Sequence, residues 1–219
     1  MNLELFDSQA LEREAPALEP IEAGAIVLRR FACADEDALL SAVNEVIAQS
    51  PLRQMQTPGG YRMSVAMTNC GALGWVSDRS GYRYDPIDPD DGQPWPAMPD
   101  VFARLATEAA AQAGFAAFRP DACLVNRYLP GTRLSLHQDR NERDFGQPIV
   151  SVSLGIPAVF LFGGARRADR PRRLPLVHGD VVVWGGPARL HFHGVLPLKE
   201  AEHRLLGACR INLTFRKAG

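Results

Sequence analysis

The second half of the chain contains short strand-like segments separated by turn-forming dipeptides. Seven such segments follow residue 121, at 122–128, 134–137, 149–154, 158–162, 172–176, 181–184 and 210–215. Between them lie Pro130-Gly131, Gly163-Gly164, Gly179-Asp180 and Gly185-Gly186, and such pairs favour turns. Many short strands that follow helices indicate a β-sandwich or jelly roll with helical buttresses, and a double-stranded β-helix is one such architecture.

Two segments in the first half have the apolar spacing of amphipathic helices. Residues 35–50 begin with acidic residues and end before Pro51, and residues 99–114 lie between Pro99 and Gly114. Both are expected to be helices laid against a sheet. The expected fold class is therefore mostly β with flanking helices (α+β), in a single domain over 1–219.

The rest of the first half is less regular. Residues 1–24 show no clear period and are expected to form an irregular arm, whereas 25–28 and 63–67 have strand patterns. Residues 69–98 combine many glycines and prolines with tryptophan and tyrosine side chains, which predicts a long aromatic loop. Such loops are usually lids or binding surfaces, although the rings can instead pin the loop to the core.

Composition excludes several other classes of protein. At 219 residues and 46% hydrophobic, the chain can bury a sizeable core, and no apolar run is long enough to span a bilayer. Its four cysteines form no C-x-x-C pair, which argues against a zinc ribbon and against a secreted disulfide framework. Because the first residues also lack a signal-peptide pattern, a soluble cytoplasmic protein is expected.

Positive charge is concentrated at one place, although the net charge is only −1. Five arginines are crowded together: Arg166, Arg167, Arg170, Arg172 and Arg173. This patch could contact phosphates, or it could be the solvated tip of a hairpin.

His137 and Asp139 lie two residues apart at the end of a strand-like segment. Side chains two apart on an extended segment point the same way, so one imidazole and one carboxylate can face a single point. A later histidine, His193, could complete the face, and two imidazoles with one carboxylate form the facial triad of non-haem iron(II) oxygenases. The remaining histidines are interpreted as structural groups: His178, His191 and His203.

The last strand-like segment has one polar and one apolar face. Its even positions are Arg210, Asn212, Thr214 and Arg216, and its odd positions are Ile211, Leu213 and Phe215. A barrel would turn one of these faces inward. Two guanidiniums on an inner face suit a small dicarboxylate, because planar forks bind carboxylates through paired charge-assisted hydrogen bonds.

Long motifs surround these residues. They include Asn126-Arg-Tyr128-x-Pro130-Gly131, Leu134-Ser-Leu-His137-Gln-Asp139, Gly179-Asp-Val-Val-Val-Trp184-Gly-Gly, His193-Gly and Arg210-x-Asn212-Leu-Thr-Phe-Arg216, with Thr57-Pro-Gly-Gly-Tyr61 and Gly74-Trp75 upstream. From about residue 50 onward the chain resembles the AlkB family, iron(II)- and 2-oxoglutarate-dependent dioxygenases that repair alkylated nucleic acid bases. The resemblance implies a double-stranded β-helix (jelly roll) core over about 121–219, with helices and a nucleotide-recognition lid in about 1–120.

The resemblance also implies the roles of individual residues. Fe(2+) would be held by the catalytic triad His137, Asp139 and His193, with 2-oxoglutarate and O2 as co-substrates. The residues implied for 2-oxoglutarate are Asn126, Tyr128, Arg210, Asn212 and Arg216, with Arg210 on the carboxylate remote from the metal and Arg216 nearer the chelating end. The residues implied for the nucleotide are Trp75 and His137 around the base, Tyr82, Arg83, Tyr84 and Arg167 on the backbone, Thr57 and Met67 along its path, and Asn141 at the base edge.

The implied reaction is oxidative demethylation of bases such as N1-methyladenine and N3-methylcytosine, with release of formaldehyde. The expected partners are methylated single-stranded or double-stranded DNA and also RNA, with no membrane, and the protein is expected to be a monomer. One departure concerns Asn141, which stands where the family carries an acidic residue, so the relative activity on methyladenine and methylcytosine is left open. Two alternatives are a non-catalytic nucleic-acid-binding barrel, and a dioxygenase of the same chemistry that acts on RNA or protein.

Overall fold

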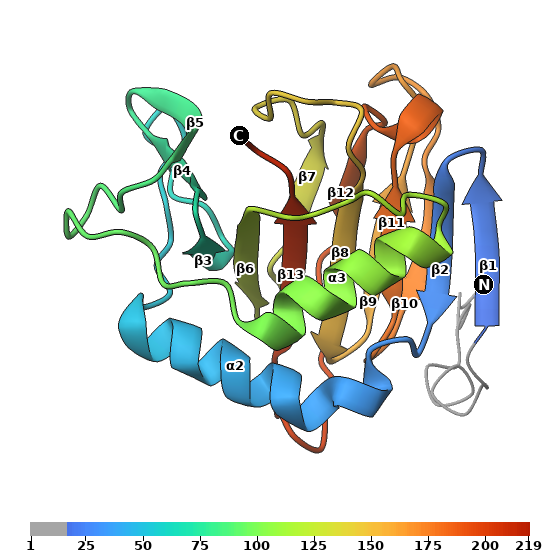
Figure 1. The fold of residues 1–219 in the computed structure, drawn as a ribbon, viewed down its shortest axis with the longest axis horizontal. Coiled ribbons are helices and arrows are strands. Elements are labelled where there is room, and N and C mark those ends of the chain that lie inside the picture. Colours follow the sequence, from blue (N-terminus) through green and yellow to red (C-terminus); the bar gives the residue numbers. More distant parts are fainter. Residues whose placement is uncertain (1–16) are drawn as a thin grey trace.

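The computed structural model of the chain describes residues 17–219, which form two antiparallel sheets, a separate hairpin and two α-helices (Figure 1). The large sheet has the order β1-β2-β11-β8-β13-β6-β3. Its strands are β1 (Ala17–Glu22), β2 (Ala25–Arg29), β3 (Ala66–Gly71), β6 (Ala122–Tyr128), β8 (Ile149–Gly155), β11 (Val181–Trp184) and β13 (Arg210–Arg216). Strands from both halves of the chain therefore share one sheet.

The small sheet has the order β10-β9-β12-β7. Its strands are β7 (Leu134–His137), β9 (Ala158–Phe162), β10 (Arg172–Leu176) and β12 (His193–Val195), and the separate hairpin consists of β4 (Gly74–Asp78) and β5 (Gly81–Asp85). Two sheets of short antiparallel strands with helical buttresses confirm the mostly β, jelly-roll fold that was predicted.

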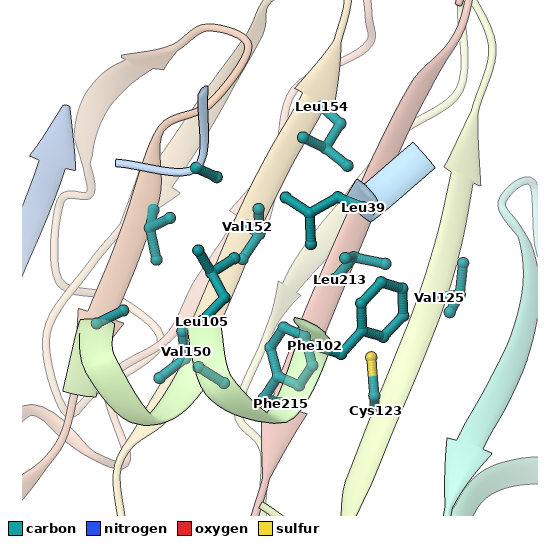
Figure 2. Packing of buried hydrophobic residues seen from close by; sticks show 14 of the residues in the cluster. Leu39, Phe102, Leu105, Cys123, Val125, Val150, Val152, Leu154, Leu213 and Phe215 are labelled. Atoms are coloured by element: carbon teal, nitrogen blue, oxygen red, sulfur yellow. The ribbon is translucent and has the colours of Figure 1, made fainter. Parts of the chain in front are cut away.

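Helices α2 (Glu36–Gln49) and α3 (Asp100–Gln112) cover one face of the large sheet (Figure 1). In Figure 2, Leu39 of α2 and Phe102 of α3 lie against valine and leucine side chains of the central strands. Phe102 also meets Phe215 of β13 edge to face, with ring centroids 5.9 Å apart. Burying each such side chain stabilises the fold by about 1.5 to 3 kcal/mol, so the odd-numbered face of β13 is committed to this core.

A second apolar core lies between the two sheets. It includes Phe160 and Phe162 of β9 and Trp184 of β11, whose rings contact one another. Because β13 faces this space with its even-numbered residues, a polar row is enclosed beside an apolar wall. This arrangement creates the candidate site.

The structure corrects three predictions made from the sequence. Residues 17–22, expected in an irregular arm, form the edge strand β1, while residues 1–16 of that arm lie outside the described residues. The long loop expected over 69–98 contains the end of β3 and the β4–β5 hairpin. Strand β12, only three residues long, was not predicted at all.

None of the helices in the described part of the chain has both the length and the apolar character needed to cross a bilayer.

Candidate active site

His137, Asp139 and His193 converge at one point of the small sheet. His137 ends β7 and His193 begins β12, and the two residues are direct partners in the antiparallel ladder. The Nε2 atom of His137 lies 3.6 Å from Asp139 Oδ1, and that of His193 lies 3.7 Å from Asp139 Oδ2. One donor atom from each residue falls within 4.8 Å of the others, close enough to share a metal ion.

Each imidazole is oriented for metal binding by the backbone carbonyl two residues before it. The Nδ1 atom of His137 lies 2.9 Å from the Ser135 carbonyl oxygen, and that of His193 lies 3.0 Å from the His191 carbonyl oxygen. A neutral imidazole that donates from Nδ1 to a carbonyl keeps its Nε2 lone pair free for a metal. The ring orientation and the carboxylate together fit a divalent transition metal with open positions.

Gly194, which follows His193, allows β7 and β12 to approach closely. A Cβ atom at this position would lie 2.6 Å from the Leu134 carbonyl oxygen, well inside van der Waals contact. The ladder is also irregular between His193 and Val195. A glycine is therefore needed at the point where the second histidine is brought opposite the first.

Arg216 holds the Asp139 carboxylate in place. Its Nε and Nη2 atoms both donate to Asp139 Oδ2, at 2.9 and 2.6 Å. Burial alone would raise the pKa of Asp139, but Arg216 and the two histidines hold that pKa well below its usual range. Loss of hydration, together with the nearby His193 ring, lowers the pKa of His137 to about 4. Asp139 is thus charged and His137 neutral at physiological pH, as metal ligation requires.

Arg210 is buried in the same cavity without a full set of partners. Its Nη2 atom donates to Ser153 Oγ at 2.9 Å, and its guanidinium carbon lies 5.0 Å from the centre of the Tyr128 ring. The Nε and Nη1 atoms have no hydrogen-bond partner, although the residue is only 2% exposed. Burial lowers the pKa of Arg210. A buried guanidinium with free donors is costly unless an anion binds there, so the site fits a carboxylate.

A cavity of about 460 Å³ contains most of the residues predicted for the site. Those that line it are Thr57, Met67, Trp75, Tyr82, Asn126, Tyr128, His137, Asp139, Asn141, His193, Arg210, Asn212 and Arg216. The even-numbered face of the last strand therefore points into the cavity, as the alternation predicted. His178, His191 and His203 lie outside it, as expected of structural groups.

Three residues predicted to contact the nucleotide do not line the cavity. Arg83 pairs with acidic residues of its own hairpin, and the Tyr84 hydroxyl donates to Glu142 Oε1 at 2.7 Å. Arg167 lies over the Phe192 ring, with its guanidinium carbon 5.6 Å from the ring centre. Contact with a nucleic acid backbone stays a prediction for all three.

The cavity mouth is framed by an aromatic pair and one amide. The rings of Trp75 and Tyr82 stack with centroids 5.7 Å apart. Asn141 bridges them, because Trp75 Nε1 donates to its Oδ1 atom at 3.2 Å and its Nδ2 atom donates to the Tyr82 carbonyl oxygen at 3.4 Å. The Trp75 backbone is fixed in turn by a pair of hydrogen bonds with the Asn69 side chain. Hydrogen bonds at both its backbone and its Nε1 atom thus fix the orientation of the tryptophan ring.

Several residues of the site were not predicted from the sequence. Phe160, Trp184 and Ser151 line the cavity, and the Trp184 ring lies 4.9 Å from the His193 ring, centre to centre. Glu142 and Arg189 are buried beside Asp139. For Phe160, Trp184 and Ser151, the alternation of inward-facing and outward-facing residues along their strands could have identified them. For Glu142 and Arg189, only proximity to the triad in the sequence could have drawn attention to them.

Comparisons with known proteins agree with this geometry. Residues 24–216 match the family described as "2OG-Fe(II) oxygenase superfamily". The chain is 60% identical over 204 residues to "Alpha-ketoglutarate-dependent dioxygenase AlkB" of Escherichia coli (strain K12), covering 93% of this chain and 94% of that protein. It is 47% identical over 182 residues to "Alpha-ketoglutarate-dependent dioxygenase AlkB homolog" of Caulobacter vibrioides (strain NA1000 / CB15N), covering 83% and 81%. A solved structure, "The structure of OsALKBH1", superposes with a TM-score of 0.79 at 28% identity, covering 92% of this chain and 100% of that one.

Proposed function

The chain belongs to the 2OG-Fe(II) oxygenase superfamily as an AlkB-type dioxygenase, and from that membership we propose that it removes methyl groups from nucleic acid bases by oxidation. The observation that carries the proposal is that three metal-ligand atoms and an arginine with free donors lie in one cavity. A non-catalytic barrel would have no need of this combination.

The protein would hold Fe(2+) through His137 Nε2, His193 Nε2 and the Asp139 carboxylate. Bound iron, with 2-oxoglutarate and O2 as co-substrates, supplies the oxidising chemistry that hydroxylates an N-methyl group, after which formaldehyde is released. Arg216 keeps Asp139 ionised, and the backbone carbonyls of Ser135 and His191 keep the imidazoles in the ligating tautomer. These residues therefore prepare the metal site before the metal binds.

For 2-oxoglutarate, Arg210 would bind the carboxylate remote from the metal, and Arg216 would lie nearer the chelating end. The free Nε and Nη1 donors of Arg210 support the first assignment, and the contact of Arg216 with a metal ligand supports the second. Asn126 and Asn212 join the same wall through the hydrogen bond between their side chains, and the buried Tyr128 ring lies under Arg210. The two ends of the acid would thus meet different arginines.

For the base, Trp75 and His137 would form the two sides of a slot, with Asn141 at its edge. A base can reach such a slot only by leaving the duplex, and a base methylated at N1 of adenine or N3 of cytosine is cationic, which favours an electron-rich aromatic surface. Tyr82, Arg83, Tyr84 and Arg167 would contact the backbone, while Thr57 and Met67 would line the path. We propose methylated single-stranded DNA, double-stranded DNA and RNA as substrates. We also propose that the protein is a cytoplasmic monomer.

The test is formaldehyde release from a methylated single-stranded oligonucleotide in the presence of Fe(2+) and 2-oxoglutarate. We expect turnover by the wild type and none by Asp139→Ala. Asp88→Ala is the matched control, because Asp88 is also a buried, arginine-paired aspartate but lies outside the cavity. No turnover by the wild type, or undiminished turnover by Asp139→Ala, would contradict the proposal. Binding without turnover would favour the non-catalytic alternative.

A further inference from the structure

Arg189 connects the two chain segments that carry the metal ligands. It follows the short 3-10 helix η2 (Gly186–Ala188), between β11 and β12, only a few residues before His193. The residue is 2% exposed. It does not line the cavity, so it contacts neither the metal position nor the space for substrates.

The guanidinium hydrogen bonds of Arg189 all go to the segment 139–147, which begins with the ligand Asp139. Nη1 donates to the Asp139 carbonyl oxygen at 3.0 Å, Nε to the Gln147 carbonyl oxygen at 2.9 Å, and Nη2 to Glu142 Oε2 at 3.0 Å. The guanidinium carbon also lies 5.3 Å from the centre of the Phe145 ring. A guanidinium holds its donors in a rigid planar fork that fits several separated acceptors, whereas the three donors of a lysine ammonium radiate from one atom and rotate.

Glu142 extends this contact to the rest of the site. Its Oε1 atom accepts the hydrogen bond from the Tyr84 hydroxyl at 2.7 Å and lies 3.4 Å from Arg216 Nε. Since Arg216 donates in turn to Asp139, the charges alternate from Arg189 through Glu142 and Arg216 to Asp139. Each buried charge has an opposite neighbour, so removing one leaves another without its partner.

We infer that Arg189 is a positioning residue, which fixes Asp139 opposite His137 and His193 without touching the metal or a substrate. The contact with the Asp139 carbonyl oxygen holds the main chain in place two residues after β7 ends. The contact with Glu142 holds Arg216, which orients the Asp139 carboxylate. The inference rests on the proposed metal site. It assigns a role to Arg189, a residue that the sequence pattern of the triad does not identify.

The test measures binding of Co(2+) alone by ligand-field absorption, without 2-oxoglutarate or nucleic acid. Loss of partners that orient metal ligands typically weakens metal affinity about 10-fold to 100-fold, and we expect Arg189→Met to raise the dissociation constant for Co(2+) by about that factor. Arg29→Met is the matched control, because Arg29 is another buried arginine, paired with Asp180 and not part of the cavity lining. It should lower the melting temperature and leave Co(2+) affinity unchanged.

Two milder variants cover the case in which Arg189→Met does not fold. Arg189→Lys keeps the positive charge and loses the planar fork. Tyr84→Phe removes only the tyrosine hydroxyl that donates to Glu142. The affinity of both variants for Co(2+) should lie between that of the wild type and that of Arg189→Met. Wild-type affinity in the folded arginine variants would overturn the inference and leave the proposed function standing. Failure of the wild type itself to bind Co(2+) would overturn the metal site and the inference together.

Discussion

Replacing Arg210 by methionine distinguishes an arginine that awaits a co-substrate from one that stabilises the fold. In the protein without ligand, Nε and Nη1 of Arg210 are buried without partners. An unsatisfied buried polar group costs about 1 to 3 kcal/mol, so the substitution relieves about 2 kcal/mol or more. It also removes the bond to Ser153 and the contact with the Tyr128 ring, together worth about 2 to 4 kcal/mol.

These opposite effects nearly cancel, so the free energy of unfolding of the unliganded protein should change by less than about 2 kcal/mol. Arg29→Met should behave differently. Arg29 is fully paired, with Asp180 and Glu19, and breaking a buried ion pair by removing one partner costs about 3 to 5 kcal/mol. Both variants make the same chemical change at a buried site.

The responses of the two variants to 2-oxoglutarate should be the reverse of their effects on stability. A ligand at 100 times its dissociation constant stabilises the folded wild type by about 2.7 kcal/mol, which is a rise in melting temperature of about 5 to 10 °C for a chain of this size. Loss of two charge-assisted hydrogen bonds of about 1.5 to 3 kcal/mol each weakens binding at least 100-fold. The same 2-oxoglutarate concentration should then stabilise Arg210→Met by less than about 0.5 kcal/mol, whereas Arg29→Met should keep the full response.

The assay is urea and thermal unfolding with Mn(2+), in the absence of O2, with and without 2-oxoglutarate. Succinate and glutarate can be compared as shorter and keto-free acids. The reasoning is refuted if Arg210→Met loses several kcal/mol without ligand and still responds to 2-oxoglutarate as the wild type does. That result would make Arg210 a structural residue whose free donors have no function.

Three further expectations concern the backbone, pH and the base slot. Gly194→Ala places a methyl group against a carbonyl oxygen of β7 and should lower the free energy of unfolding by about 1 to 3 kcal/mol in urea titrations, whereas Gly59→Ala, which has ordinary contacts, should change it little. Burial and the stacked His203 ring lower the pKa of His178 to about 4. On acidification, the unfolded state therefore takes up a proton at this imidazole before the folded state does. The free energy of unfolding should fall as the pH drops from about 6.5 to 4, by at most about 3 kcal/mol. Unfolding of His178→Gln should depend less on pH over this window, and an identical profile would show that another group is responsible. Trp75→Ala should weaken binding of a methylated oligonucleotide by about 1 to 3 kcal/mol in fluorescence anisotropy, and Leu205→Ala, at an exposed apolar residue outside the cavity, should not.

The fold could be predicted from the sequence wherever a strand or helix had a committed apolar face. Strand β13 is the clearest case, because its alternation predicts opposite faces for Phe215 and Arg216, which lie in the helix-covered core and in the cavity respectively. Edge elements lacked such a signal. Pro20 argues against a central strand but is tolerated in β1, which lies at the edge of the large sheet and pairs only with β2.

The hairpin was missed for a related reason. Strands β4 and β5 form their own two-stranded sheet. In β4, Ser77 and Asp78 put polar residues on both faces, so no apolar alternation marks that strand, and the alternation of tyrosine with charged residues in β5 is short. The turn between them has its own signal, since Gly81 adopts φ +122°. The hairpin is attached to the protein by individual hydrogen bonds, such as that between Trp75 and Asn141. Its sequence therefore resembles that of a loop.

For the site, the sequence could identify donors and acceptors but not the pairs they form. The triad could be proposed because two of its members share a strand-like segment, and their convergence with His193 is now observed. Arg189 and Glu142 have no such periodicity, and their importance follows only from contacts between segments far apart in the chain. A buried arginine becomes interpretable once its acceptors are known. Each of the three guanidinium nitrogens of Arg189 donates to an acceptor within the protein, which indicates a positioning role. In Arg210, the Nε and Nη1 atoms have no acceptor, which indicates that a ligand binds there.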